Sequence, residues 1–201
     1  SKYMIELYFP IRDKYTFGYK NGDPTFYDIP HKGVDIICKE GTPIYAPMDG
    51  IITKKATAAA EGNELKILVF KEDLKVESYM CHLQKYAPQI AVGVLVQEGD
   101  LIGYVGATGT RTTGTHLHWH LYLNGKVADP LLYIRKTKEQ KKEEFINAFD
   151  IKLVLVKDTQ KFYRLYNRQF QEMVSMDLIL HYLHRRDGGA VIDSRKFAEL
   201  Q

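Results

Sequence analysis

The chain has 201 residues but only two cysteines, Cys38 and Cys81, which are too few for a disulfide framework. Both have apolar neighbours, so we expect two buried thiols that behave as small hydrophobic side chains. No apolar run comes near the roughly 18 residues that a membrane-spanning helix requires, which excludes a transmembrane segment. The sequence also lacks an internal repeat and a low-complexity tract.

A strong excess of charge of one sign is missing as well. The net charge is only +3, and nucleic-acid binding is typical of chains with a stronger, clustered basic surface, so no nucleic-acid partner is expected. The amino-terminal stretch SKYMIELYFP lacks the pattern of a signal peptide, and it does not determine the cellular location. Hydrophobic residues make up 45% of the chain and charged residues 26%, as in ordinary globular domains.

What the sequence does contain is a succession of short apolar segments within residues 1–134. These segments are rich in β-branched and aromatic residues, and Gly, Pro, Asn and Asp turn signals separate them at close intervals. The pattern is typical of a β-sandwich or barrel, so we predict a mainly β domain here. The expected strands are residues 33–38, 42–48, 50–56, 65–70, 75–80, 101–106 and 116–124.

The composition changes near residues 135–140, where we place a domain boundary. Residues 135–145 carry a dense run of charges, which is typical of a solvated helix face, and residues 151–158 read as a strand. Beyond Asp158, a predicted helix N-cap, apolar side chains recur at helical spacing. We therefore predict an α-helical C-terminal extension, residues 135–201, whose role stays open: its apolar stripe would cap the β domain, serve self-association or bind a partner module. The stripe consists of Phe162, Leu165, Tyr166, Phe170, Met173 and Val174.

Three histidines, His116, His118 and His120, alternate within the segment GTHLHWHLYLNG. Alternate side chains of a β-strand lie on one face, so these three imidazoles are expected to point the same way. A single buried histidine is more often hydrogen-bonded locally, but three in register favour a metal or proton-transfer site. In the segment HKGVD, His31 and Asp35 offer the imidazole nitrogen and carboxylate oxygen of a zinc half-site. A third protein ligand would leave a fourth position for water.

The order of the motifs along the chain is specific, although His82 in YMCHLQKY is uninformative alone. The segments FPIRDKYTFGY, HKGVD, GTPIYAPMDGII, YMCHL, VQEGDLIGYVGATGTRTTGTHLHWH and VADPLLYI follow one another over residues 9–134. Together they resemble the lysostaphin-type (LytM-like) zinc peptidoglycan endopeptidases. The resemblance implies an antiparallel β-sandwich or barrel-like core, built from a duplicated hybrid motif, in a metallopeptidase domain at residues 1–134. It also implies one bound Zn²⁺ and bacterial peptidoglycan as substrate. The implied location is extracellular, periplasmic, in the cell envelope or phage-associated.

The functional residues of that family match positions of this chain one by one. The first metal histidine and the metal aspartate match His31 and Asp35. In the HxH element of the family the second histidine is a metal ligand, which is His118 here, and the first is catalytic, which is His116. A further catalytic histidine, in a Tyr-x-His-Leu type element, matches His82, with one extra residue after the tyrosine.

The chemistry explains why these residue types are needed. Zn²⁺ bound by two neutral imidazoles and one carboxylate keeps a net positive charge, so it lowers the pKa of bound water toward about 7 and polarises a scissile carbonyl. Of His116 and His82, one is expected to accept the water proton and pass it to the leaving amine, and the other to hydrogen-bond the oxyanion. The place of His116 beside His118 favours it as the base, but the sequence leaves the two roles open.

Two features of the site stay open at the level of sequence. His120 stands where the family commonly has a glutamate, and it either contacts the site or the substrate or forms a wall that faces away from the metal. A tyrosine shortly before the first metal histidine often assists the transition state in this family. Tyr27 and Tyr19 are both candidates for that contact.

Two other functions are alternatives to an enzyme of this kind. A non-catalytic LytM-like module would bind the cell wall or activate a partner hydrolase, but such modules usually lack a metal or catalytic residue, and none is missing here. A phosphocarrier like the glucose permease IIA domains shares a related β architecture and a histidine pair. The HLH spacing with HxxxD upstream suits a metal site better than phosphoryl transfer.

Overall fold

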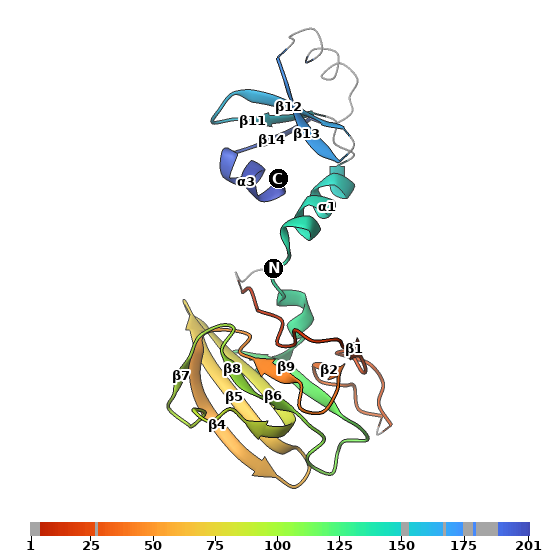
Figure 1. Cartoon of the computed structure of the whole chain (residues 1–201), viewed down its shortest axis with the longest axis vertical. Helices are drawn as coiled ribbons and strands as arrows, with labels where there is room; N and C mark the ends of the chain where they lie inside the picture. The colour runs from red at the N-terminus through yellow and green to blue at the C-terminus, as the bar shows by residue number, and fades with distance from the viewer. Residues whose placement is uncertain (1–4, 27, 150–152, 167, 175–178, 180–188) are drawn as a thin grey trace. The chain divides into compact units, whose positions relative to one another are not determined.

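The chain divides into two compact units, residues 1–135 and 136–201, and each is described by itself (Figure 1). The computed structural model describes residues 5–26, 28–149, 153–166, 168–174, 179 and 189–201. Among these residues no helix is long and apolar enough to cross a membrane.

The described part of unit 1 forms a ten-stranded sheet in which neighbouring strands pair antiparallel. The central path of the sheet runs β1-β2-β9-β6-β5-β4-β7, while β10 pairs with β9, and β8 pairs with both β3 and β6. The mainly β, antiparallel prediction is therefore confirmed for this unit, and the duplicated hybrid motif stays a prediction. The strands are β1 (Thr16–Phe17), β2 (Val34–Ile37), β3 (Pro43–Tyr45), β4 (Gly50–Ala58), β5 (Gly62–Lys71), β6 (Leu74–Tyr86), β7 (Leu95–Val96), β8 (Leu101–Val105), β9 (His116–Leu123) and β10 (Lys126–Ala128).

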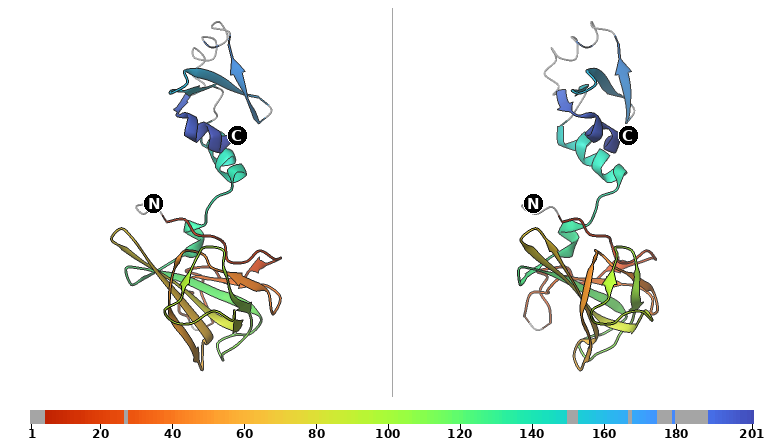
Figure 2. Two further views of the ribbon diagram at one scale, coloured as in Figure 1. Left: turned by 60° about the vertical axis from the view of Figure 1, so that its left-hand side comes forward. Right: turned by 90° about the vertical axis from the view of Figure 1, so that its left-hand side faces the viewer.

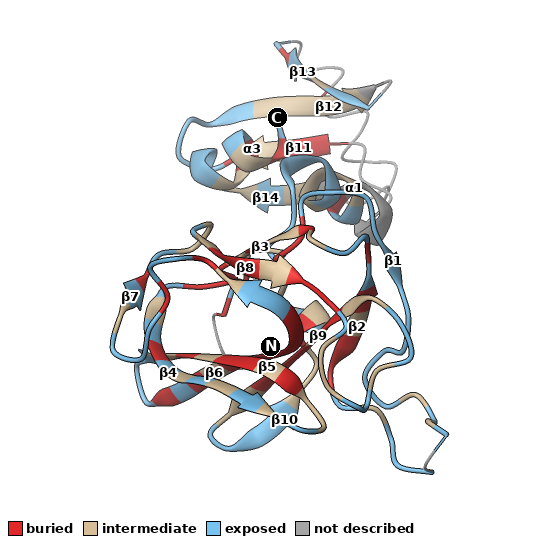
Figure 3. Cartoon of the chain, turned by 60° about the horizontal axis from the view of Figure 1, so that its bottom comes forward, coloured by how far each residue is buried: buried red, intermediate tan, exposed pale blue. Residues whose placement is uncertain are grey.

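Strand β9 shows how the sequence alternation divides the two faces of the sheet. Leu117, Trp119 and Leu121 are fully buried in the core of unit 1, whose buried positions are red in Figure 3. The indole Nε1 of Trp119 donates a 2.8 Å hydrogen bond to the hydroxyl of Ser78 on β6, so its one polar atom is satisfied inside the core. The intervening histidines lie on the opposite face, as the period of two predicts.

Every expected segment of unit 1 contains a strand, so those predictions are confirmed. The short strands β1, β7 and β10 were not predicted, because two or three residues carry too little alternation to be recognised. The expectation for Cys38 and Cys81 is also confirmed, since both are free and buried. A 3₁₀ turn, η1 (Pro130–Tyr133), follows β10, and the Asp129 carboxylate caps it by accepting from the backbone N–H of Leu131.

The described part of unit 2 contains two helices and a four-stranded sheet (Figure 2), and side chains from the helices and the sheet pack into one core. Phe145 of α1 and Leu200 of α3 pack with Val154 of β11 on one side, while Leu153 and Met173 belong to a separate buried cluster. The sheet order is β13-β12-β11-β14, with β11 and β14 parallel. The elements are α1 (Lys138–Phe149), β11 (Leu153–Val156), β12 (Lys161–Tyr166), β13 (Gln169–Met173), β14 (Gly189–Ile192) and α3 (Ser194–Leu200).

The predicted α-helical extension is wrong for the apolar stripe after Asp158. Five of its six residues fall on the hairpin β12–β13, in which Phe162 pairs with Met173 and Leu165 pairs with Phe170, and Val174 follows β13. Two short strands folded back on each other can place apolar residues at intervals that imitate helical spacing. Within the residues that the structure describes, the predicted stripe therefore forms no helical face.

The other elements predicted for the extension have mixed outcomes. The charged run does form a helix, α1, and the strand expected at residues 151–158 is β11, so both predictions are confirmed. The prediction that Asp158 is the N-cap of a helix directly after it is wrong, because the strand β12 follows it. The Asp158 carboxylate accepts hydrogen bonds from the backbone N–H and the hydroxyl of Ser194, the first residue of α3.

We predict that a chain ending at Arg135 folds by itself. Unit 1 has its own core, and Arg135 ties its end to the unit through a 2.9 Å bond from its N–H to the carbonyl of Leu7 and a 2.6 Å ion pair with Glu98. The measurement is urea unfolding followed by the fluorescence of Trp119, which is fully buried. One cooperative transition is expected, and a truncated chain that aggregates or unfolds without cooperativity would contradict the prediction.

Candidate metal centre

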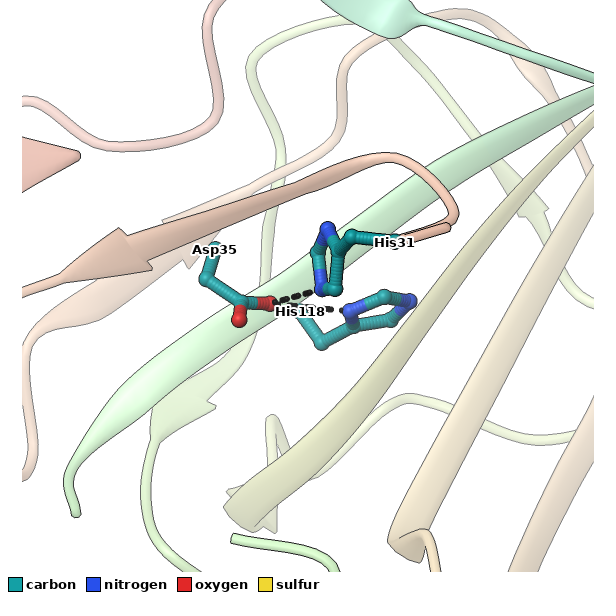
Figure 4. A group of neighbouring side chains, drawn as sticks. All are labelled: His31, Asp35 and His118. Carbon is teal, nitrogen blue, oxygen red and sulfur yellow. Dashed lines mark hydrogen bonds and ion pairs between the residues drawn. The ribbon is translucent and has the colours of Figure 1, made fainter. Parts of the chain in front are cut away.

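Pairing between β2 and β9 brings the first two side chains of the site together. Asp35 lies directly opposite His118 in the antiparallel register, so both side chains lie on the same face of adjacent strands. The Nδ1 atom of His118 is 2.9 Å from Oδ1 of Asp35 (Figure 4). The sequence separates these residues widely, and only the sheet makes them neighbours.

His31 reaches the same point from the segment that precedes β2. Its Nε2 lies 3.2 Å from Oδ1 of Asp35, and one ligand atom from each of His31, Asp35 and His118 lies within 4.8 Å of the others. The three side chains are between 11% and 14% exposed, so the cluster is largely shielded from solvent but still accessible. Figure 4 shows both imidazoles converging on a single carboxylate oxygen.

Gly33 allows the chain to pass from His31 into β2. Its φ is +78°, and a Cβ at this position would lie 2.2 Å from the carbonyl oxygen of Trp119 and 2.3 Å from the Cβ of His120. A side chain is therefore excluded both by the backbone conformation and by the close approach to β9. The backbone N–H of Gly33 donates to Oδ1 of Asn21 at 2.9 Å, and this hydrogen bond helps to hold the turn between His31 and β2.

The donor set fits a zinc ion chemically. Zinc in proteins takes imidazole nitrogen and carboxylate oxygen at about 2.0–2.2 Å with tetrahedral geometry, which places neighbouring ligand atoms about 3.3–3.6 Å apart. The carbonyl of Gly33 lies 3.1 Å from Nδ1 of His31, so a proton on Nδ1 leaves the lone pair on Nε2, the atom that faces Asp35. Burial alone would raise the pKa of Asp35, but the imidazoles of His118 and His31 beside it hold it well below its usual range. The carboxylate is therefore ionised and available as a ligand.

The two candidate catalytic histidines lie beside this cluster. The ring centroids of His82 and His116 are 5.0 Å apart, and Nε2 of His116 is 3.7 Å from Oδ1 of Asp35. Nδ1 of His116 lies 2.9 Å from the carbonyl of Gly114, and Nδ1 of His82 lies 2.8 Å from that of Thr108. In the neutral form each ring can thus donate through Nδ1 and keep an unprotonated Nε2.

His82 has an unusual backbone for a histidine within a strand. Its φ is +66°, and its N–H leaves the ladder to donate to the carbonyl of Glu61 at 2.9 Å. Burial, with smaller contributions from the nearby His116 and His118, lowers the pKa of His82. The ring is therefore kept neutral and can accept a proton.

His120 completes the row on β9 but is far less accessible than the other two histidines. It is only 5% exposed, and its ring lies 4.8 Å from the ring of Tyr79 and 4.9 Å from that of Tyr122 between centroids. Its Nδ1 is 2.9 Å from Nε2 of His118. Burial lowers the pKa of His120 to about 3, so the ring is neutral.

The two candidate tyrosines have different outcomes. Tyr19 lies beside the cluster, with its ring centroid 5.5 Å from that of His31 and its side chain half-exposed. Its carbonyl accepts the N–H of Asp35 at 2.8 Å, so the backbone also links it to the site. Tyr27 lies outside the described residues.

Sequence reasoning missed the groups that support the histidines. The carbonyls of Gly114 and Thr108 carry no sequence signal, because every residue has a carbonyl. Gly33 was detectable in principle, since an isolated glycine between two polar ligands indicates a turn or a close approach.

Comparison with known proteins shows where the chain belongs. The family model described as peptidase family M23 matches residues 29–130, just over half of the chain. The chain is a member of peptidase family M23. This confirms the lysostaphin-type resemblance, and the match spans all five histidine and aspartate positions of the site. Unit 2 lies outside it.

Individual M23 proteins are similar over the same part. DD-carboxypeptidase/endopeptidase Mpg of Neisseria meningitidis is 37% identical over 109 residues, which are 54% of this chain and 24% of that protein. This chain thus spans about a quarter of the length of that curated relative.

Two solved structures share the fold. The catalytic domain of the antimicrobial peptidase lysostaphin from Staphylococcus simulans has a TM-score of 0.51 and 28% identity, covering 60% of this chain and 90% of that one. A zinc-containing peptidase from Vibrio cholerae has a TM-score of 0.51 and 28% identity, covering 64% of this chain and 40% of that one.

We predict that Gly33→Ala destabilises the protein much more than Gly22→Ala. Both glycines have a positive φ, but a Cβ at Gly22 has nothing within 4 Å, so that variant has only the backbone strain of about 1–2 kcal/mol. Gly33→Ala adds the clash with β9, for a total loss of about 2–5 kcal/mol in the free energy of unfolding. Urea unfolding of both variants measures the difference, and equal losses would show that the close approach is unimportant.

Proposed function

We propose that this chain is a zinc-dependent endopeptidase that hydrolyses amide bonds in the peptide stems or cross-bridges of bacterial peptidoglycan. The observation that carries the proposal is the convergence of His31 Nε2, Asp35 Oδ1 and His118 Nδ1 on one point, with His116 and His82 beside it. Membership of the M23 family and the names of its relatives, among them a DD-carboxypeptidase/endopeptidase, support the choice of substrate.

One Zn²⁺ would be held by His31, Asp35 and His118. Two neutral nitrogens and one carboxylate suit zinc better than a hard cation such as magnesium or calcium, which prefers oxygen ligands. When bound, zinc lowers the pKa of water toward about 7 and polarises a carbonyl oxygen. The zinc content of a structurally similar Vibrio cholerae peptidase supports the same metal here.

The chain's own residues then move the protons. His116, 3.7 Å from the Asp35 oxygen, is the group best placed to accept a proton from the attacking water through Nε2 and to pass it to the leaving amine. His82, whose neutral ring holds its proton on Nδ1, would hydrogen-bond the oxyanion through Nε2 after taking up a second proton from solvent, which the negative charge of the oxyanion stabilises. Tyr19, half-exposed beside His31, is the candidate contact to the substrate or transition state.

The proposed substrate sets the place of action. Peptidoglycan lies in the bacterial wall, so the protein would act outside the cytoplasmic membrane, in the periplasm or envelope, or as part of a phage. The competing function, a non-catalytic module that binds wall or activates a hydrolase, predicts no need for a metal. Metal analysis therefore separates the two functions directly.

We predict that His118→Ala abolishes both zinc retention and wall hydrolysis. The variant removes one of three protein ligands and leaves Asp35 without its 2.9 Å partner. Zinc is measured by elemental analysis after purification without chelators, and hydrolysis by mass spectrometry of fragments released from defined peptidoglycans. Full hydrolysis by a metal-free His118→Ala protein would refute the proposed mechanism. Native protein that retains no zinc would favour the binding module.

We predict that His116→Asn and His82→Asn each keep one zinc per chain but reduce kcat by about 10²–10⁴-fold, the usual contribution of a positioned acid or base. Asparagine is chosen because it tolerates the positive φ of His82, and the same replacement at His116 makes the two variants comparable. Steady-state hydrolysis of a defined peptide fragment, together with zinc analysis, measures both effects. A native rate in either variant would exclude that histidine from the proton transfers.

A further inference from the structure

Four imidazoles surround the candidate metal centre, and in three of them the ring is oriented in the same way. In each of the three, Nδ1 lies within hydrogen-bond distance of a backbone carbonyl, and Nε2 is left for the site. The pairs are His31 with Gly33 at 3.1 Å, His82 with Thr108 at 2.8 Å and His116 with Gly114 at 2.9 Å.

His118 is oriented differently. Its Nδ1, not its Nε2, faces Asp35, and its Nε2 lies 2.9 Å from Nδ1 of His120. Within the described residues, the imidazole of His120 stands where the other rings have a carbonyl. The side chain that orients this metal-ligand candidate is therefore a second histidine on the same strand face.

We infer that His120 is a positioning residue: it accepts the Nε2–H of His118 and thereby fixes the tautomer in which Nδ1 of His118 carries the lone pair for the metal. The inference rests on the proposed function in so far as that metal is zinc. In this role His120 makes no contact with the substrate.

Hydrogen-bond accounting shows what this assignment requires of the two rings. A neutral imidazole has one donor and one acceptor nitrogen, so a lone pair on Nδ1 of His118 places the proton on Nε2. That proton needs an acceptor in a buried setting, and Nδ1 of His120 is at the right distance. The proton of His120 is then on its own Nε2, a buried atom with no hydrogen-bond partner among the described residues.

The opposite arrangement would close the site to a metal. If His120 donated from Nδ1, the proton of His118 would be on its Nδ1 and would point at Asp35, where the ion has to bind. A backbone carbonyl can only accept, but an imidazole can do either. His120 therefore differs from the other three supports, because its tautomer decides whether its neighbour can act as a ligand.

The surroundings of His120 exclude a role in direct contact with substrate. The side chain is 5% exposed, and the rings of Tyr79 and Tyr122 lie against it. The hydroxyl of Tyr79 is engaged by the carboxylate of Glu64, so it donates away from His120. His120 can thus reach the reaction only through His118.

A matched pair of variants tests the inference on the full chain. His120→Asn keeps an acceptor, Oδ1, at the place of Nδ1. Leucine has nearly the same shape as asparagine, but His120→Leu has no acceptor. We expect His120→Leu to weaken zinc binding by about 10–100-fold, the usual effect of losing such a partner, and His120→Asn to stay close to the native affinity. Competition with a chromophoric chelator gives the affinities. Equal zinc affinity in both variants would overturn the inference.

Nitrogen NMR of histidine-labelled protein supplies a readout that does not depend on activity or on any variant. In the zinc-loaded chain we expect His118 protonated on Nε2 and a coupling across the hydrogen bond to Nδ1 of His120. An unprotonated Nε2 of His118 in zinc-loaded protein, or no coupling, would overturn the inference even if His120→Leu failed to fold. If purified protein retained no zinc, the proposed function would fail, but the tautomer of His118 read after addition of Zn²⁺ would still decide the role of His120.

Discussion

The antiparallel pairing of β2 with β9 is the constraint on which the candidate site depends. It sets Asp35 opposite His118, and the period of two then places His116 and His120 on the same face. The other face of β9 enters the core through Trp119, whose indole is tied to Ser78 of the next strand. A slip of one residue would exchange the two faces, so the packing of the core and the geometry of the site specify one register.

The sequence predicted most of this unit because two kinds of signal agreed. Alternation located the long strands, and ordered motifs named the residues that the fold then brought together, His31, Asp35 and His118. The supports of the rings could not be predicted, since the carbonyl of Thr108 or Gly114 is identical to any other until the loop is folded. Their places are properties of the tertiary structure.

Unit 2 shows the opposite outcome. There the spacing of apolar residues alone supported a helix, and strand pairing of Phe162 with Met173 gave the same spacing for another reason. No motif was available to decide between the two, and the hairpin is stabilised by partners elsewhere in the unit, such as β11. Periodicity without a second, independent signal therefore failed, whereas in unit 1 the two signals supported each other.

The 83-residue separation between Asp35 and His118 has a consequence for stability. An unfolded chain holds these two ligands far apart on average, and bringing them together costs the conformational entropy of closing a long loop. In the folded protein the β2–β9 pairing has already closed that loop, so metal binding does not bear this cost. A metal that needs both would bind the native state and hardly the unfolded one. Free metal at about 1,000 times its Kd would then add about 4 kcal/mol to the free energy of unfolding. The ion would thus stabilise the same β2–β9 pairing that forms its site.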